Sequence, residues 1–188
     1  MAGILCYTSL VHEKEGLSIC VSTNLRSASE IMKKVVKFAE VVKVLSRGGI
    51  SYTSSFDRVT FSTGARVISV PAGDGTAGRG FTIKGALLID EAAYIPHLEE
   101  LLQGIGPTLT VCKDAQLVLA STPSGRNHPF YKLWCQAVED DEWYASKVTI
   151  DDAIAQGLNV DIDQLHKLVP DPLAFATEYM CEFAAESS

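Results

Sequence analysis

The stretch Ala86-Leu87-Leu88-Ile89-Asp90-Glu91 decides the fold class, because a run of apolar residues leads directly into two acids. Such a run is typical of a β-strand that is buried on both faces, as the strands of a parallel sheet are. We therefore predict a strand that ends at Asp90. In α/β proteins ligands bind beyond the carboxyl ends of the strands, so both carboxylates are expected at a ligand site.

Helices and strands are predicted to alternate on both sides of this stretch, which indicates an α/β fold with a largely parallel sheet. The second predicted helix begins with Ser27 and Glu30 at the spacing of a capping box. The first offers four apolar side chains for burial: Ile4, Leu5, Leu10 and Val11. The predicted helices are Met1–His12, Ser27–Leu45, His97–Leu102, Pro129–Val138, Asp161–Leu168 and Pro172–Phe183. The predicted strands are Leu17–Val21, a β-meander (Ile50–Ser55, Val59–Ser62, Arg66–Val70), a buried strand Gln116–Ala120 and an outer strand Tyr144–Ile150.

Length and composition favour one globular domain, with 188 residues of which 47% are hydrophobic and 21% charged. The net charge of -7 argues against a generally basic protein that coats nucleic acid, although a local basic groove remains possible. The five cysteines are scattered without a C-x-x-C pair, which indicates neither a disulfide framework nor a zinc site. No apolar run approaches the roughly 20 residues that span a bilayer, so we expect an intracellular protein without a membrane partner.

The two acids after the strand are suited to nucleotide hydrolysis. A carboxylate at Asp90 could hold Mg²⁺ through its water shell, and a carboxylate at Glu91 could polarise a water for attack on the γ-phosphate. The structural alternative is that Asp90 caps the following turn while Glu91 is solvated.

Two further segments could complete such a site. Ser121 and Thr122 follow the apolar strand Gln116–Ala120, where a hydroxyl could sense the γ-phosphate, although both could also bond local backbone groups. Arg79 lies in the glycine-rich segment Asp74–Gly80, shortly before the acidic strand. It could neutralise phosphate charge or engage a neighbouring molecule, or it could be a surface cation.

The order of these motifs resembles the ATPase domain of viral DNA-packaging terminase large subunits, and the resemblance covers nearly the whole chain. Leu87–Ala93 resembles the Walker B segment of that family, and Ala120–Gly125, with Ala-Ser-Thr-Pro-Ser-Gly, resembles its coupling motif. The other similar segments are Ser18–Ser29, Gly64–Gly80, Asn127–Tyr131 and Phe175–Phe183.

This resemblance implies a P-loop NTPase-like fold of the RecA/ASCE type, in which a mainly parallel sheet is flanked by helices and carries an inserted β-meander. It implies that Asp90 coordinates Mg²⁺ at the nucleotide, that Glu91 activates water, and that Thr122 contacts the nucleotide and, with Ser121, couples its state to DNA movement. Arg79 is implied as a further catalytic residue. The implied cofactors are ATP and Mg²⁺, and the implied partners are double-stranded DNA, a portal protein, a small terminase subunit and further copies of the chain in a ring. The implied location is the cytoplasm of a bacterial host.

The chain departs from the family pattern at its phosphate-binding loop, because no G-x-x-x-x-G-K-[ST] occurs in it. Since Met1–His12 resembles the helix that follows this loop, we expect the Walker A loop and its strand to lie upstream. We expect the lost strand to neighbour the Walker B strand and its absence to leave unpaired strand edges. Residues 1–188 are thus expected to form a partial ATPase domain, without a nuclease domain, that binds ATP poorly and is inactive alone. The alternatives are another P-loop-class DNA translocase or helicase, or a catalytically inactive remnant or interaction module.

Overall fold

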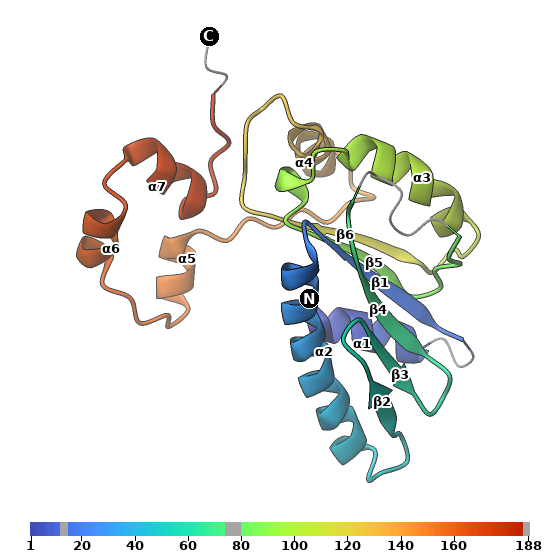
Figure 1. Cartoon of the computed structure of the whole chain (residues 1–188). Helices are drawn as coiled ribbons and strands as arrows, with labels where there is room; N and C mark the ends of the chain where they lie inside the picture. The colour runs from blue at the N-terminus through green and yellow to red at the C-terminus, as the bar shows by residue number, and fades with distance from the viewer. Residues whose placement is uncertain (12–14, 74–79, 186–188) are drawn as a thin grey trace. The chain divides into compact units, whose positions relative to one another are not determined.

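The computed structural model describes residues 1–11, 15–73 and 80–185. The chain forms two compact units, Met1–Ala120 and Ser121–Ser188. In the described residues, the first unit holds the sheet with helices α1, α2 and α3, and the second holds the shorter helices α4 to α7 (Figure 1).

The first unit is built on one six-stranded sheet with the order β2-β3-β4-β1-β5-β6 (Figure 1). The strands β4, β1, β5 and β6 are parallel, whereas β2, β3 and β4 form the predicted antiparallel meander. This arrangement confirms the predicted mixed α/β fold. The strands are β1 (Leu17–Ser22), β2 (Tyr52–Ser54), β3 (Arg58–Phe61), β4 (Arg66–Pro71), β5 (Ala86–Asp90) and β6 (Gln116–Ala120).

The strand order corrects one expectation about open edges. We expected the acidic strand, β5, to lie beside a gap, but it pairs with β1 on one side and with β6 on the other. Among the described strands, β6 is at the edge of the sheet. Its apolar residues, predicted to be buried, are consequently only partly buried, because a strand with one neighbour has one uncovered side.

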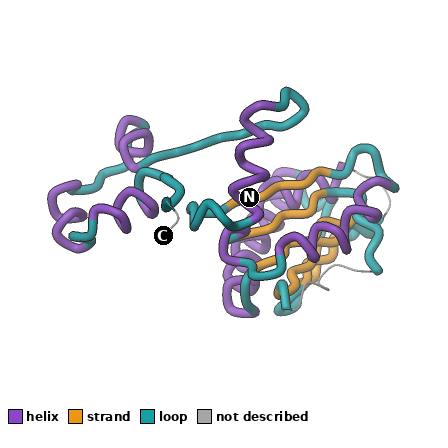
Figure 2. Tube along the Cα trace, turned by 90° about the horizontal axis from the view of Figure 1, so that it is seen from above, coloured by secondary structure: helices purple, strands orange, loops and turns teal. Residues whose placement is uncertain are grey.

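Helices α1 (Ala2–Val11) and α2 (Leu25–Leu45) pack on one face of this sheet. Every second strand residue faces them, so Cys20 and Leu88 join α1 and α2 in one apolar core. Residues of the other parity, such as Ile19 and Leu87, point to the opposite face and are also fully buried. Figure 2 shows the strands from above as one layer with helices alongside.

Two predictions about the helices were wrong in detail. In α1, Leu5 is fully buried, but Ile4 and Val11 are 41% and 54% exposed, and smaller side chains such as Ala2 and Cys6 meet the core instead. The helix is apolar all round, so its sequence does not determine which side is buried. In α2, the helix begins earlier than predicted and its N-cap is Asn24, so the capping box at Ser27 does not form.

The third helix, α3 (Leu98–Thr110), continues well beyond the predicted end at Leu102 and includes Pro107. It buries Leu98, Leu101 and Ile105, which follow the spacing of one helix face. The short 3₁₀ turn η1 (Ala92–Tyr94) connects β5 to this part of the chain.

The second unit contains α4 (Pro129–Glu139), α5 (Ile150–Ala155), α6 (Ile162–Leu168) and α7 (Pro172–Glu178). The ring of Phe183 packs against Phe130, Tyr131 and Trp134 of α4, which ties the end of this unit to its first helix. α7 ends at Glu178 and does not reach Phe183, the predicted end of this helix.

The predicted outer strand Tyr144–Ile150 does not form. Residues 144–149 belong to no helix or strand, the side chain of Tyr144 is 91% exposed, and Ile150 instead begins α5. The capping box of α5 is formed by Thr149 and Asp152. Within the described part of the chain, no helix is long and apolar enough to cross a membrane.

Candidate functional site

Asp90 and Glu91 lie at the carboxyl end of β5, in the interior of the sheet. Asp90 is the last residue of the strand, and β1 and β6 run parallel to it on either side. Glu91 follows in the left-handed backbone region, with φ 54° and ψ 42°. A non-glycine residue pays a conformational penalty in that region, and such residues are frequent at functional sites. The chain therefore turns away from the strand direction directly after Asp90.

The carboxylate of Asp90 is half-buried on the sheet face that carries α1 and α2. Burial raises its pKa above the ordinary value, while the Lys34 ammonium, the backbone N–H of Glu91 and the N-terminal ammonium act in the opposite direction. The charge of Asp90 also contributes, after burial, to raising the pKa of the Cys20 thiol to about 12. Asp90 is thus within electrostatic range of the Lys34 ammonium and of the N-terminal ammonium.

Ser22, which the sequence analysis did not single out, lies beside Asp90 on the neighbouring strand. The parallel register pairs Val21 with Ile89, so the next residues in each strand, Ser22 and Asp90, lie side by side and point to the same face. Ser22 is fully buried, and its hydroxyl oxygen has no hydrogen-bond partner among the described residues. The signal in the sequence was a polar residue directly after an apolar strand, the same signal that identified Asp90.

The two predicted hydroxyl residues follow the strand on the other side of β5. Ala120, the last residue of β6, pairs with Asp90, and Ser121 and Thr122 come next in the chain. Both are partly buried and both take part in interactions. The structure thus brings together the carboxyl ends of the three strands that carry Ser22, Asp90 and Ala120. Arg79 lies outside the described residues.

These groups are suited to Mg²⁺ rather than to a metal enclosed by protein ligands. In the described ranges there is no group of three or more histidine, cysteine, aspartate or glutamate side chains that could hold a metal ion. Mg²⁺ is commonly bound through one or two carboxylates, with waters and substrate phosphates completing its coordination. A half-buried carboxylate at Asp90 and an unpartnered buried hydroxyl at Ser22 fit this kind of site.

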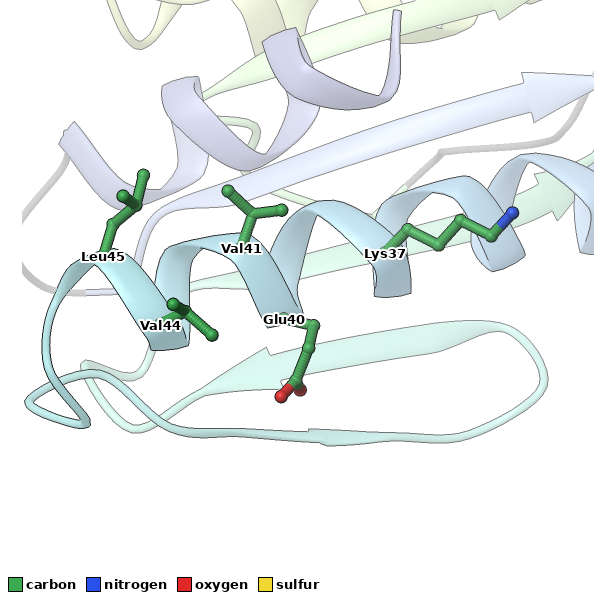
Figure 3. A pocket seen from close by; sticks show the side chains of 5 residues that line it. All are labelled: Lys37, Glu40, Val41, Val44 and Leu45. Carbon is green, nitrogen blue, oxygen red and sulfur yellow. The ribbon is translucent and has the colours of Figure 1, made fainter.

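A shallow apolar depression lies elsewhere on the molecule, along the last turns of α2 (Figure 3). Since α2 follows the carboxyl end of β1 and runs for 21 residues, its last turns lie far from Asp90. The depression is therefore a separate surface feature. Its lining residues are Lys37, Glu40, Val41, Val44 and Leu45.

The geometry can be compared with known proteins. The family model described as "Terminase large subunit, T4likevirus-type, N-terminal" matches residues 4–188. The ATPase domain of the large terminase of Thermus phage P74-26 has a similar structure, with a TM-score of 0.72, 20% identity, and coverage of 97% of this chain and 82% of that domain.

Two larger terminases are also similar. The large terminase from a thermophilic bacteriophage, in complex with ADP, gives a TM-score of 0.74 at 14% identity, with coverage of 98% of this chain and 44% of that one. The HK97 bacteriophage large terminase gives a TM-score of 0.69 at 14% identity, with coverage of 97% of this chain and 43% of that one. This chain therefore spans less than half the length of those two proteins. At these identities the structural likeness shows a shared fold.

Proposed function

Because this chain belongs to the family of terminase large subunits, whose members form part of a DNA-packaging motor, we propose that Asp90 and Glu91 are the metal-binding and water-activating residues of an ATPase site. The observation that carries the proposal is the position of Asp90. It is a half-buried carboxylate at the carboxyl end of an interior parallel strand, next to a buried hydroxyl without a partner among the described residues. Ligands of open α/β sheets bind at this end of the strands.

In the proposed mechanism each acid has a separate task. Asp90 would hold Mg²⁺, which when bound neutralises charge on the β- and γ-phosphates. Glu91 would accept a hydrogen bond from the attacking water and orient it toward the γ-phosphate. Glu91 adopts the left-handed backbone conformation, which is frequent at functional sites, and this supports a task of its own for Glu91.

We assign the remaining predicted residues by the same family relationship. Thr122, with Ser121, would sense the γ-phosphate and transmit its loss to the rest of the chain, and Arg79 would neutralise phosphate charge or engage a neighbouring subunit. The large terminase from the thermophilic bacteriophage has been obtained in complexes with ADP and with ATP-gamma-S, which supports a nucleotide as the ligand of this site.

On the larger scale, we propose that residues 1–188 represent part of a terminase ATPase domain that works in a ring of identical copies. Double-stranded DNA, a portal protein and a small terminase subunit would be its partners, in the cytoplasm of a bacterial host. Family membership supports this proposal. The net charge of -7 means that contacts to DNA phosphates would need a local cluster of basic side chains or a partner's surface.

Since the 188 residues contain no G-x-x-x-x-G-K-[ST], they lack the loop whose backbone N–H groups and lysine hold the β- and γ-phosphates. We therefore expect the chain by itself to bind ATP weakly and to show no steady turnover. Micromolar ATP affinity with steady hydrolysis that disappears in Glu91→Gln would contradict this expectation.

The metal site can be tested without turnover. Mn²⁺, a paramagnetic substitute for Mg²⁺, should broaden the amide NMR signals around Asp90 as it is titrated. Asp90→Asn should abolish this local broadening, whereas Glu91→Gln should preserve it because Glu91 is assigned to the water. Glu99→Gln, which removes an exposed acid in the first turn of α3, is the matched control and should change nothing. Equal broadening in Asp90→Asn and in the unmodified chain would refute the assignment.

A further inference from the structure

Among the described residues of the first unit, five hydroxyl side chains are buried, and Ser22 differs from the other four. Thr8 and Ser9 of α1 donate to carbonyls one turn earlier in their own helix, each at 2.8 Å. Ser18 of β1 accepts a hydrogen bond from the backbone N–H of Ala86 at 3.0 Å. Ser69 of β4 donates to a carbonyl of α2 at 3.3 Å. Ser22 is as deeply buried as these residues, and its oxygen has no partner among the described residues.

An unpartnered hydroxyl in this position destabilises the fold, because it has lost its hydrogen bonds to water and gained none in the protein. An alanine or a valine would avoid that penalty at the end of an apolar strand. The presence of a serine therefore points to a second state of the protein in which the hydroxyl is used.

Ser22 lies between Pro71 of β4 and, by continuation of the β1–β5 register, Asp90 of β5, and of these two side chains only that of Asp90 is polar. Neighbouring parallel strands lie about 4.8 Å apart, and side chains that are side by side on one face can exchange a hydrogen bond after a change of rotamer. In the structure the Asp90 carboxylate accepts a hydrogen bond from the backbone N–H of Glu91 and is attracted by the Lys34 ammonium. Because each carboxylate oxygen has two lone pairs, the Asp90 carboxylate can still accept a further hydrogen bond or bind a cation.

We propose that Ser22 is a positioning residue for the divalent cation site: its hydroxyl donates a hydrogen bond to the Asp90 carboxylate when that carboxylate binds the cation. The proposal rests on the metal role of Asp90 given above. A carboxylate that uses one oxygen for a metal ion retains the other for a hydrogen bond, and such bonds to ligating groups fix their orientation and raise affinity. Ser22 would thus hold Asp90 in the orientation that the cation requires.

Two substitutions separate this role from simple packing. Ser22→Ala removes the hydroxyl and leaves no unpaired polar atom, and Ser22→Cys keeps nearly the same volume with a much weaker donor. The matched control is Ser69→Ala, a buried serine on the same face of the sheet whose hydroxyl is satisfied by the carbonyl of Ala28.

The experiment combines thermal unfolding without metal and the Mn²⁺ titration followed by NMR. Without metal, Ser22→Ala should raise the unfolding midpoint by about 2–6 °C, whereas Ser69→Ala should lower it. In the titration, Ser22→Ala should need about tenfold more Mn²⁺ for half-maximal broadening around Asp90, Ser22→Cys should show a similar loss, and Ser69→Ala should match the unmodified chain.

The possible failures are distinguishable. If the unmodified chain shows no broadening that depends on Asp90, the metal role of Asp90 is wrong, and the role of Ser22 fails with it. If that broadening is present but Ser22→Ala has the same midpoint as the unmodified chain, only the role of Ser22 is overturned. A fall in thermal stability of Ser22→Ala comparable to that of Ser69→Ala would also overturn it, because the hydroxyl would then have a partner in the metal-free fold.

Discussion

Replacing Gly85 with alanine should destabilise the first unit, because the added Cβ would overlap a hydroxyl that joins α1 to the sheet. That hydroxyl is the Ser18 side chain, and the Cβ would also lie 3.2 Å from two backbone atoms. The Ser18 oxygen accepts a hydrogen bond from the Ala86 N–H at 3.0 Å, and it lies 2.8 Å from the Ser9 hydroxyl oxygen and 3.0 Å from the Thr8 hydroxyl oxygen. The extra methyl group therefore meets side chains that are already held in place.

The expected loss has two parts. Overpacking of a well-packed interior costs about 1–3 kcal/mol. If the Ser18 hydroxyl is displaced, the buried N–H of Ala86 loses its acceptor, which costs about another 1–3 kcal/mol. Gly85→Ala should thus lower the free energy of unfolding by about 2–6 kcal/mol. Ser18→Ala alone should lower it by about 1–3 kcal/mol, because Thr8 and Ser9 retain their carbonyl acceptors in α1.

The double variant tests the physical reason. Ser18→Ala removes the atom with which the new Cβ overlaps, so the combined loss should be smaller than the sum of the single losses by at least about 1 kcal/mol. Urea unfolding followed by circular dichroism measures these values. Fluorescence would not serve, because Trp134 and Trp143 both belong to the second unit. Additive losses, within about 0.5 kcal/mol, would show that the overlap with Ser18 is not the cause.

Three further predictions concern local features of the fold. Asn24→Ala should lower the free energy of unfolding in urea by about 1 kcal/mol, because its side chain caps α2, whereas Ser27→Ala should change it by less than about 0.5 kcal/mol. At pH 8 a thiol reagent should leave Cys6 and Cys20 unmodified in the folded chain, since burial raises the pKa of these thiols to about 11 and about 12; rapid labelling of either would contradict this. The pKa of Asp152 lies below its ordinary value of 3.8, because its carboxylate accepts hydrogen bonds from Thr149, the N-cap of α5. The stability that the ionised carboxylate gives to α5 is therefore present above pH 3.8 and is lost as the pH falls through the lowered pKa. Hydrogen exchange at the start of α5 should therefore accelerate on acidification in the unmodified chain and be insensitive to it in Asp152→Asn.

The strands of the sheet could largely be predicted because their signals are local. β5 is a short apolar run between Gly85 and Asp90, and β6 is an apolar run that begins at Gln116 and is followed by Ser121. The strand order could not be predicted, and for that reason the incomplete burial of β6 was missed. Strand pairing is also the reason why the strand predicted at Tyr144–Ile150 is absent from the structure. Its residues are suited to an extended conformation, but a β-strand also needs a partner, and the partner is not encoded in the segment itself.

The site could be predicted in part for the same reason. Asp90 and Glu91 stand out because two acids after an apolar run are conspicuous in any sequence. Ser22 does not, because a serine at the end of a strand is common and becomes informative only through its burial and its register with Asp90. The left-handed conformation of Glu91 was also beyond sequence reasoning, since glutamate carries no preference for it.

Among the described residues, the buried serines on this face of the sheet are Ser18, Ser22 and Ser69, and they differ in whether their hydroxyls are hydrogen-bonded. Ser18 and Ser69 each connect the sheet to a helix through hydrogen bonds, so their burial stabilises the unit. Ser22 is buried equally well and makes no such connection among the described residues, and it is the serine beside Asp90. Glu91, the next residue after Asp90, also has an unfavourable backbone conformation. Two unfavourable features are thus found beside the same strand end. Since packing alone would favour a satisfied or apolar residue at position 22, the unpartnered hydroxyl supports the proposal that the carboxyl end of β5 serves a ligand.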